Sequence, residues 1–380
     1  TSNVRFGVNA GNSIASGGVQ NVVIGDEAGT ALTTGDSNVA IGFEALKTED
    51  EHGLNVAIGS QALRTLNAGT NAFNVAIGAS AGYSLTTGVQ NVLIGGLSGD
   101  ALTDADANVG VGMSTLSANV LGSNNVAIGT NSLASLNPAS AVAMYNTAVG
   151  SNAGIAITTG TANTLIGGLS GDALTTGSNN VALGLSALST DDVGSRSVAI
   201  GSNALESQNT ASAGNVYNTA VGYGAGAAVT TGVQNTLVGG LAGDAITTAN
   251  NSAAFGYLAL SANTTGINNT AIGSGALLSN TTAANNTAVG INSLLANTTG
   301  AENVAVGSSA LDANTVGQRN VAMGHLSLSA DTTGRSSVAI GWHALTSQNF
   351  TGNNHTYNTA VGESAGAAVT TGVNNTLIGG

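Results

Sequence analysis

Acidic residues recur at fixed places in this chain, and carboxylates are natural ligands for Ca²⁺. Three of them lie five residues after a glycine that closes a recurring apolar phrase, namely Asp100, Asp172 and Asp244. The adjacent pair Asp191 and Asp192 follows such a glycine by seven and eight residues, as Glu49 and Asp50 do. These turns are candidate calcium sites. The alternative is that the carboxylates keep a weakly charged surface soluble and prevent lateral association.

Histidine is the second residue type that could bind a metal, and the chain has four. His325 and His343 follow consecutive phrase glycines, and Trp342 precedes His343 directly. A metal or ligand site there competes with a simpler interpretation, a polar rim beside an exposed ring. Ser, His and Asp form no legible nucleophilic arrangement, and no Gly-Lys-Ser or Gly-Lys-Thr phosphate loop exists. We therefore expect the protein not to be an enzyme.

Four aromatic residues each precede the phrase directly in places where the repeat is interrupted or extended: Phe73, Tyr145, Tyr217 and Tyr357. They break an otherwise uniform pattern, which makes them candidate contact positions together with Trp342. The competing interpretation is that each plugs the core where the repeat widens.

The composition excludes several classes of protein. Of 380 residues, 7% are charged and 42% are hydrophobic, so the chain fits neither an ordinary globular domain nor a disordered one. Only six Lys and Arg stand against a net charge of −13, which disfavours nucleic acid as a partner. Cysteine is absent, and no apolar run is long enough for a transmembrane helix. The chain begins at Thr1, so we expect it to be processed or to be a segment of a longer chain.

The recurring phrase is Asn-Val-Ala-Ile-Gly, as at residues 38–42, and we call its last residue the anchor glycine. Anchor glycines recur from Gly7 to Gly379, and their numbers differ by 17 in most cases, as for Gly25, Gly42 and Gly59. A slower rhythm groups four repeats into a block, because Gly78, Gly150 and Gly222 are spaced by 72. We predict one continuous repeat domain over residues 1–380, because a fixed period indicates a solenoid.

A 17-residue unit is too short for a two-helix repeat, and the phrase alternates with the period of a strand. We predict a coil of two five-residue strands and two tight turns. Stacked coils give an all-β, parallel β-solenoid of about 22 coils and roughly 100 Å. Ladders are expected for isoleucine (Ile24, Ile41, Ile58), leucine (Leu46, Leu63, Leu116, Leu133) and the Asn that opens each phrase. Anchor glycines are expected at positive φ.

The two sides of the phrase are expected to face different surroundings. The Val/Ile side would fill the roll. The alanine side, with Ala40, Ala57 and Ala76, would face partner chains. A lone two-layer roll has little interior, which favours a homotrimer of side-by-side rolls.

The repeat Asn-Val-Ala-Ile-Gly-x-x-Ala-Leu with Asn/Thr/Gly turns resembles the YadA-like head repeat of trimeric autotransporter adhesins, a repeat also found in phage tail fibres. The likeness covers essentially the whole chain. It implies a left-handed β-roll, a homotrimer, and an extracellular place on a cell surface or virion fibre. The typical repeat of that family is shorter than the unit found here, so the Thr-Thr-Gly turn is expected to be longer.

The leading hypothesis is a structural, trimeric adhesin or tail-fibre rod that attaches to a host surface through an unknown receptor or glycan. One alternative is an extracellular filament whose subunits join end to end. Another is a solenoid module that binds calcium or ice. Adjacent threonines such as Thr86 and Thr87 disfavour ice, because neighbouring side chains point to opposite faces.

Overall fold

The computed structural model describes residues 2–210, 212–352 and 354–380. They fall into two compact units, Thr1–Ser195 (unit 1) and Arg196–Gly380 (unit 2). There is no helix among the described residues, and the two units together contain about 22 solenoid turns with the expected spacing. The predicted parallel β-solenoid is thus confirmed. No helix in the described ranges has the length and apolarity needed to cross a membrane.

Unit 1 contains eleven three-residue strands and three two-residue strands. They are β1 (Val4–Phe6), β2 (Val22–Ile24), β3 (Val39–Ile41), β4 (Val56–Ile58), β5 (Val75–Ile77), β6 (Val92–Ile94), β7 (Val109–Val111), β8 (Gly122–Ser123), β9 (Val126–Ile128), β10 (Val142–Ala143), β11 (Thr147–Val149), β12 (Thr164–Ile166), β13 (Val181–Leu183) and β14 (Gly194–Ser195).

Unit 2 contains eleven three-residue strands and one two-residue strand. They are β15 (Val198–Ile200), β16 (Gly214–Asn215), β17 (Thr219–Val221), β18 (Thr236–Val238), β19 (Ala253–Phe255), β20 (Thr270–Ile272), β21 (Thr287–Val289), β22 (Val304–Val306), β23 (Val321–Met323), β24 (Val338–Ile340), β25 (Thr359–Val361) and β26 (Thr376–Ile378).

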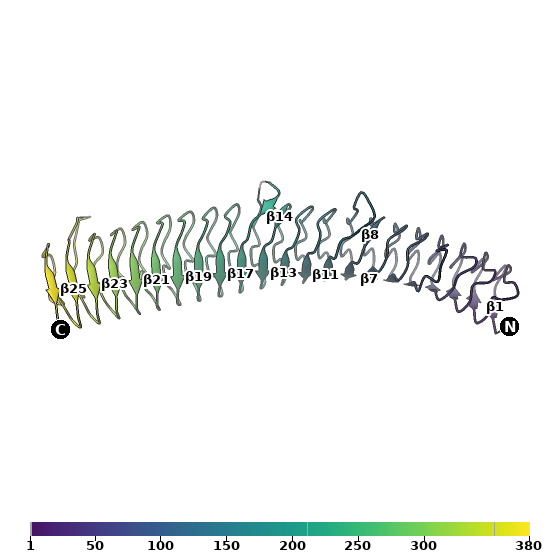
Figure 1. The fold of residues 1–380 in the computed structure, drawn as a ribbon, viewed down its shortest axis with the longest axis horizontal. Coiled ribbons are helices and arrows are strands. Elements are labelled where there is room, and N and C mark those ends of the chain that lie inside the picture. The colour runs from purple at the N-terminus through teal and green to yellow at the C-terminus, as the bar shows by residue number, and fades with distance from the viewer. Residues whose placement is uncertain (1, 211, 353) are drawn as a thin grey trace. The chain divides into compact units, whose positions relative to one another are not determined.

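Within each unit, the three-residue strands of successive coils pair in parallel, and the arrows stand side by side (Figure 1). Between β3 and β4 the register matches Val39 with Val56 and Ile41 with Ile58. Identical positions of successive repeats therefore lie beside each other. The isoleucine ladder predicted from the sequence is confirmed.

Each coil contributes one three-residue strand to the stack, and the second strands present, β8, β10, β14 and β16, have only two residues each, so the prediction of two five-residue strands per coil is wrong. After Gly42 the chain forms tight turns, with positive φ at Glu44 (55°) and Leu46 (49°). The N–H of Ala45 donates to the carbonyl of Gly42 at 3.3 Å, and the N–H of Leu46 donates to Ala62 of the next coil at 2.9 Å. Left-handed residues at every second position bend the backbone, so this side of the coil cannot extend.

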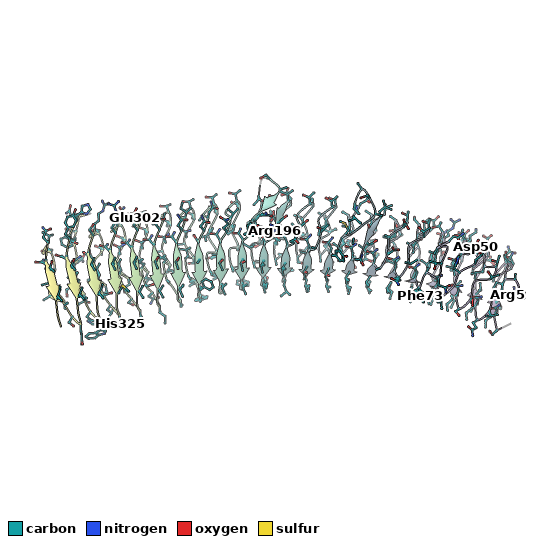
Figure 2. All side chains as sticks on the ribbon, viewed as in Figure 1. Arg5, Asp50, Phe73, Arg196, Glu302 and His325 are labelled. Atoms are coloured by element: carbon teal, nitrogen blue, oxygen red, sulfur yellow. The ribbon has the colours of Figure 1, made fainter. Side chains whose placement is uncertain are left out.

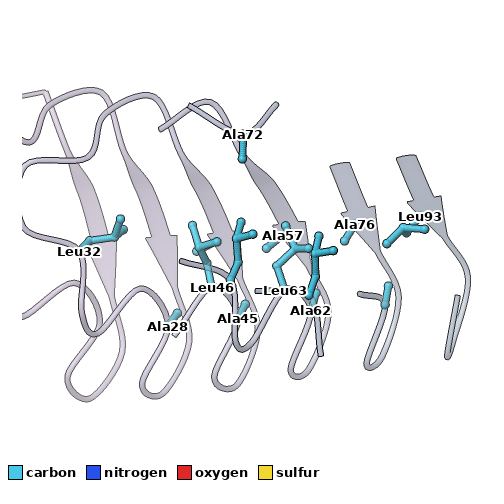
Figure 3. Packing of buried hydrophobic residues seen from close by; sticks show 14 of the residues in the cluster. Ala28, Leu32, Ala45, Leu46, Ala57, Ala62, Leu63, Ala72, Ala76 and Leu93 are labelled. Carbon is cyan, nitrogen blue, oxygen red and sulfur yellow. The ribbon is translucent and has the colours of Figure 1, made fainter. Parts of the chain in front are cut away.

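The assignment of the two strand sides is also wrong. The central alanines Ala40, Ala57 and Ala76 are 0% exposed, whereas Val39 and Ile41 on either side of Ala40 are only half-buried. Figure 3 shows Leu46 and Leu63 pointing into the space that the coils enclose, with Ala57 and Ala76 on the strands. The leucines fill this narrow interior, so only a small residue fits opposite them on the strand.

Two further sequence predictions are confirmed. The N–H of Asn55 donates to Oδ1 of Asn38 in the preceding coil at 3.1 Å, and both side chains are fully buried. The anchor glycine Gly42 has φ +133°, and a Cβ there would lie 2.5 Å from the carbonyl oxygen of Gly59. Glycine is needed at this corner because consecutive anchors approach too closely for any side chain.

Candidate functional site

Within each unit, the outward side of the strands presents a row of apolar side chains, with valine or threonine beside it in most strands. We call the first and third residues of the three-residue strands the outer strand face. The third residue is apolar in every such strand, and Ile77, Ile128 and Ile166 remain 36–37% exposed. From β2 to β26 the described strand residues include no charged side chain. Soluble monomers rarely leave a long apolar surface uncovered, so this face is a candidate interface.

The four aromatic residues of the interrupted repeats are exposed. Phe73 is 54% exposed and Tyr145 is 64% exposed, with Tyr217 and Tyr357 at 47% and 58%. The idea that they plug the core is therefore wrong. The residue before each aromatic is the buried one: Ala72, Met144, Val216 and Thr356. All four aromatics have positive φ, between 48° and 56°, which turns the ring outward while its predecessor points inward.

Two of these aromatic rings have defined partners. Nη1 of Arg196 donates to the hydroxyl of Tyr217 at 2.8 Å, and the guanidinium lies 5.8 Å from the ring centre. The ring of Tyr357 stacks on His355 with 5.1 Å between centres. The tyrosines are thus held in place at the surface, as contact positions require, and they stay candidate contacts.

The structure brings His325, His343 and Trp342 together, as the sequence predicts. Trp342 stacks on His343 with ring centres 3.8 Å apart, and His325 lies 6.1 Å from His343. His325 projects outward from the ribbon (Figure 2), and its Nδ1 lies 3.1 Å from the carbonyl of Ser308. Trp342 is 49% exposed. Among the described residues no third ligand converges on these two imidazoles, and two are too few for a metal site, so this cluster offers a surface of rings instead.

Asp100, Asp172 and Asp244 occupy equivalent positions, and Asp312 shares the position although the sequence reading missed it. Each is half-buried, and Oδ1 of each has no hydrogen-bond partner among the described residues. Burial raises the pKa of each carboxyl. The sequence signal that could have identified Asp312 is its position five residues after the anchor Gly307.

Asp191 and Asp192 have different surroundings, although they are neighbours. Asp191 is 0% exposed, and its Oδ1 accepts the N–H of Gly194 at 3.0 Å, so it belongs to the interior. Asp192 is half-buried, and the backbone carbonyl of Asp192 accepts the N–H of Thr175. Neither carboxylate belongs to a group of three or more potential metal ligands that converge among the described residues.

One group of potential metal ligands does converge within the described ranges. Ligand atoms of Glu49, Asp50 and His52 lie within 4.8 Å of one another. Glu49 is fully buried, its Oε1 accepts the N–H of His52 at 3.2 Å, and burial raises the pKa of its carboxyl. Ca²⁺ takes six to eight oxygen ligands, which three side chains do not supply. Calcium binding stays a prediction.

A compact ion-pair network lies on the turn side of unit 1. Nζ of Lys47 contacts carboxylates of Glu27 at 2.5 Å and Glu44 at 2.6 Å, and Nε of Arg64 contacts Glu44 at 2.7 Å. Hydrogen bonds from Arg64, Lys47 and Gln61 lower the pKa of Glu44 to about 2. These contacts join side chains two and five residues after successive anchors, so these two positions are neighbours on the surface.

Threonines in the turns form a ladder. Oγ1 of Thr264 donates to the carbonyl of Thr281, and Oγ1 of Thr281 donates to Thr298, both at 3.1 Å. The first threonine of each pair thus uses its hydroxyl to join coils. The second, such as Thr265, is exposed, so the threonines that ice binding would need are in part used to join the backbone of successive coils.

No family model matches this chain, and no curated protein matches it.

Proposed function

We propose that this protein is a non-enzymatic fibrous subunit that works outside the cell, on a cell surface or virion fibre. Its stacked coils would form the rod of an adhesin or tail fibre that attaches to another surface. The resemblance of the Asn-Val-Ala-Ile-Gly repeat to trimeric adhesin heads suggests this role. The parallel solenoid fold is compatible with it.

The observation that carries the proposal is the outer strand face. It presents apolar side chains in every described coil and carries no charge from β2 to β26. A surface of this kind gains free energy when it is covered, at about 25 cal/mol per Å² of apolar area. We propose that two further copies of the chain cover it, in a homotrimer of side-by-side left-handed rolls. This replaces the alanine side, which is interior, with the Val/Ile side as the interface.

The oligomeric state tests this proposal. Light scattering on the purified chain should give three times the chain mass of 36.5 kDa. A charge on the outer strand face, as in Ile166→Lys, should dissociate the trimer because a buried ammonium without a partner costs several kcal/mol. A stable monomer at all concentrations would refute the trimer.

The matched control is Leu169→Lys in the same coil. Leu169 is 39% exposed and Ile166 is 37% exposed, but Leu169 lies on the turn side, two residues after its anchor. If both variants dissociate equally, the outer strand face is not the interface. If only Ile166→Lys dissociates, the interface is assigned to the strand side.

A further inference from the structure

A shallow depression of about 290 Å³ opens on the turn side of unit 2. It is lined by Asn203, Glu206, Ser207, Tyr223, Gly224, Ala227, Ala228, Leu241 and Asp244. We call it the Tyr223 depression. It spans three successive coils, whose anchors are Gly201, Gly222 and Gly239.

The depression exists because the middle coil lacks two side chains. Positions two and five residues after an anchor face outward on the turn side, and here they are Gly224 and Ala227. The coils on either side carry larger residues at the same positions: Asn203 and Glu206 before, Leu241 and Asp244 after. A coil with small residues between two coils with larger ones leaves a hollow one coil wide.

The chain contains two other complete copies of this three-coil arrangement, which start at Gly59 and Gly129, and in both the central position is filled. The partial copy that starts at Gly341 has Ala367 at the central position. Where unit 2 has Ala227, the equivalent positions carry Tyr83 and Ile155. Where it has Tyr223, they carry Ala79 and Ser151, and in place of Glu206 they carry Arg64 and Ala134. Asp244 is unchanged, as Asp100 and Asp172. Three differences therefore converge on one place: an emptied centre, an added ring and an added carboxylate.

The walls of the depression define the chemistry of its ligand. Tyr223 is 64% exposed and provides a ring face beside the apolar carbons of Leu241 and Ala228. Asp244 lines the depression and is half-buried, and its Oδ1 has no hydrogen-bond partner among the described residues, as at the equivalent Asp100 and Asp172. The lining includes two carboxylates and no Lys, Arg or His, which excludes an anionic ligand.

We propose that the Tyr223 depression binds a neutral hexose unit of a glycan, with the sugar ring stacked on Tyr223 and its hydroxyls donating to Asp244 and Glu206. A pyranose has an apolar C–H face and a rim of hydroxyl donors, which matches a ring wall beside carboxylate acceptors. Hydrogen bonds to a charged acceptor are among the stronger ones. The biological purpose of such a site rests on the proposed attachment role, but the binding itself does not.

A second ring extends the surface. Tyr257 follows its anchor directly, as Tyr223 does, two coils further on and therefore about 10 Å away. Between them stands Gly240, and a Cβ at Gly240 would lie 3.6 Å from Cδ2 of Tyr257. Tyr257 is 58% exposed. An oligosaccharide that reaches both rings should bind more tightly than a monosaccharide.

The test is saturation-transfer NMR on the whole chain with the methyl glycosides of glucose, galactose, mannose and N-acetylglucosamine. At least one should bind with a Kd in the millimolar range, and neutral oligosaccharides of that sugar should bind at least tenfold more tightly. Ala227→Ile and Tyr223→Ser should each weaken binding at least tenfold. Both variants introduce the residue that an equivalent position already carries, and their circular-dichroism melts should match the wild type.

A matched control is Ile155→Ala, which opens the equivalent position in unit 1 without supplying the ring or the second carboxylate. It should add no sugar binding. A new site of equal affinity there would overturn the roles of Tyr223 and Glu206. If no sugar of the panel binds, the proposed site is refuted. It is also refuted if CaCl₂ binds in place of sugar and Ala227→Ile abolishes that calcium binding.

Light scattering separates this proposal from the previous one. If the chain is a trimer but binds no sugar, only the proposed sugar site is refuted. If the chain is a monomer whose sugar binding is weakened by Ala227→Ile, the proposed sugar site is supported and only the proposed trimer is refuted.

Discussion

One interior position carries two different chemistries in the two units. Seven residues after the anchor, unit 1 mostly has a fully buried aliphatic side chain: Leu32, Leu66, Leu85, Leu102, Leu136, Ile157 and Leu174. Unit 2 has an unbroken buried polar run at the same position: Asn263, Asn280, Asn297, Asn314, Asp331 and Gln348. An enclosed polar group is costly unless it is hydrogen-bonded, so the two regions solve one packing problem in different ways.

Members of the polar run hydrogen-bond to one another, although Oδ1 of Asn314 has no partner among the described residues. Nδ2 of Asn280 donates to Oδ1 of Asn263, and Nδ2 of Asn297 donates to Oδ1 of Asn280, both at 2.8 Å. Nε2 of Gln348 donates to Oδ2 of Asp331 at 2.6 Å. Polar side chains in this run thus bond to the coil before or after them. The lesson is that a solenoid interior accepts polar residues in runs, where each coil supplies the partner for the next.

The two regions also divide the interior volume differently. In unit 1 the coil of Leu102 has Gly99 at the preceding interior position, and a Cβ there would lie 2.7 Å from Cδ1 of Leu102. In unit 2 the coil of Asn297 has the fully buried Leu294 instead. In these two 17-residue coils the larger residue at one position accompanies the smaller one at the other. The longer coils that start at Gly59 and Gly129 instead bury a leucine at both positions, Leu63 with Leu66 and Leu133 with Leu136.

The largest effect is expected where an aliphatic residue is removed. Leu85→Ala should lower the local stability of its coil by about 2–5 kcal/mol, because Leu85 is fully buried and its neighbours at this position are leucines. Hydrogen exchange of the surrounding amides measures this. The control Leu97→Ala changes a leucine that is 46% exposed in the next coil and should cost far less. Equal effects would mean that the interior is not close-packed.

A smaller loss is expected where the polar run is interrupted. Asn297→Leu removes the donor to Asn280 and the acceptor for Asn314, and should cost about 2–3 kcal/mol by leaving buried groups unpaired. Hydrogen exchange at Gly300 and the adjacent coils reports the change. The exposed substitution Thr282→Leu serves as control. A stabilising Asn297→Leu would show that the run is not maintained for stability.

Glu49 occupies the same interior position and adds a pH dependence. Because burial raises the pKa of its carboxyl, the folded protein binds that proton more tightly than the unfolded chain does. The stabilisation from the tighter proton binding is fully present below pH 4.5, the ordinary pKa of Glu, and is lost as the pH rises through the raised pKa of the folded state. Glu49→Gln should therefore raise the melting temperature of unit 1 at pH 7 and have little effect near pH 3.

Glu44 provides the opposite control in the same turn. Its pKa of about 2 lies below the ordinary 4.5, so its ion pairs stabilise the fold above pH 4.5 and are lost as the pH falls towards 2. Glu44→Gln should lower stability at pH 7 and make little difference near pH 2. Melting curves that shift in the same direction for both variants would contradict the assigned surroundings.

The smallest effect is expected on the threonine ladder. Thr281→Val keeps the shape of the side chain and removes the bond from Oγ1 to the carbonyl of Thr298, at a cost of about 0.5–1.5 kcal/mol. The exposed neighbour gives the control, since Thr282→Val should change stability by less than about 0.5 kcal/mol. Urea-induced unfolding, monitored by hydrogen exchange, measures the stability of the two variants. Equal losses would mean that the ladder contributes nothing beyond β-branching.

Periodicity was enough to predict the coil length, the parallel stacking, the asparagine ladder and the positive φ of anchor glycines. It could not show which side of Val39-Ala40-Ile41 faces inward, because alternation defines two faces of a strand but does not tell which of them is buried. Which face is buried depends on the turns opposite the strand, where Leu46 already fills the interior. The second strand was mispredicted for a related reason: positive φ at leucine is uncommon and leaves no sequence signal.

The surface sites were less predictable. The proximity of His325 and His343 followed from their consecutive anchors, whereas the exposure of Tyr145 depends on a left-handed backbone that buries Met144 instead. The Tyr223 depression was missed because Ala227 looks like ordinary variation within a repeat. Alignment of the chain's own copies reveals it, since Tyr83 and Ile155 stand at the equivalent positions.

The register that pairs Val39 with Val56 has a mechanical consequence. A coil advances the stack by only about 4.8 Å, yet its backbone spans roughly 58 Å when fully extended. Under tension, the coil that detaches first therefore releases about twelve times the length it occupied. Such a stack would unfold one coil at a time and dissipate energy at each step. The detachment of single coils would therefore limit the peak force on the points where the ends of the chain are attached.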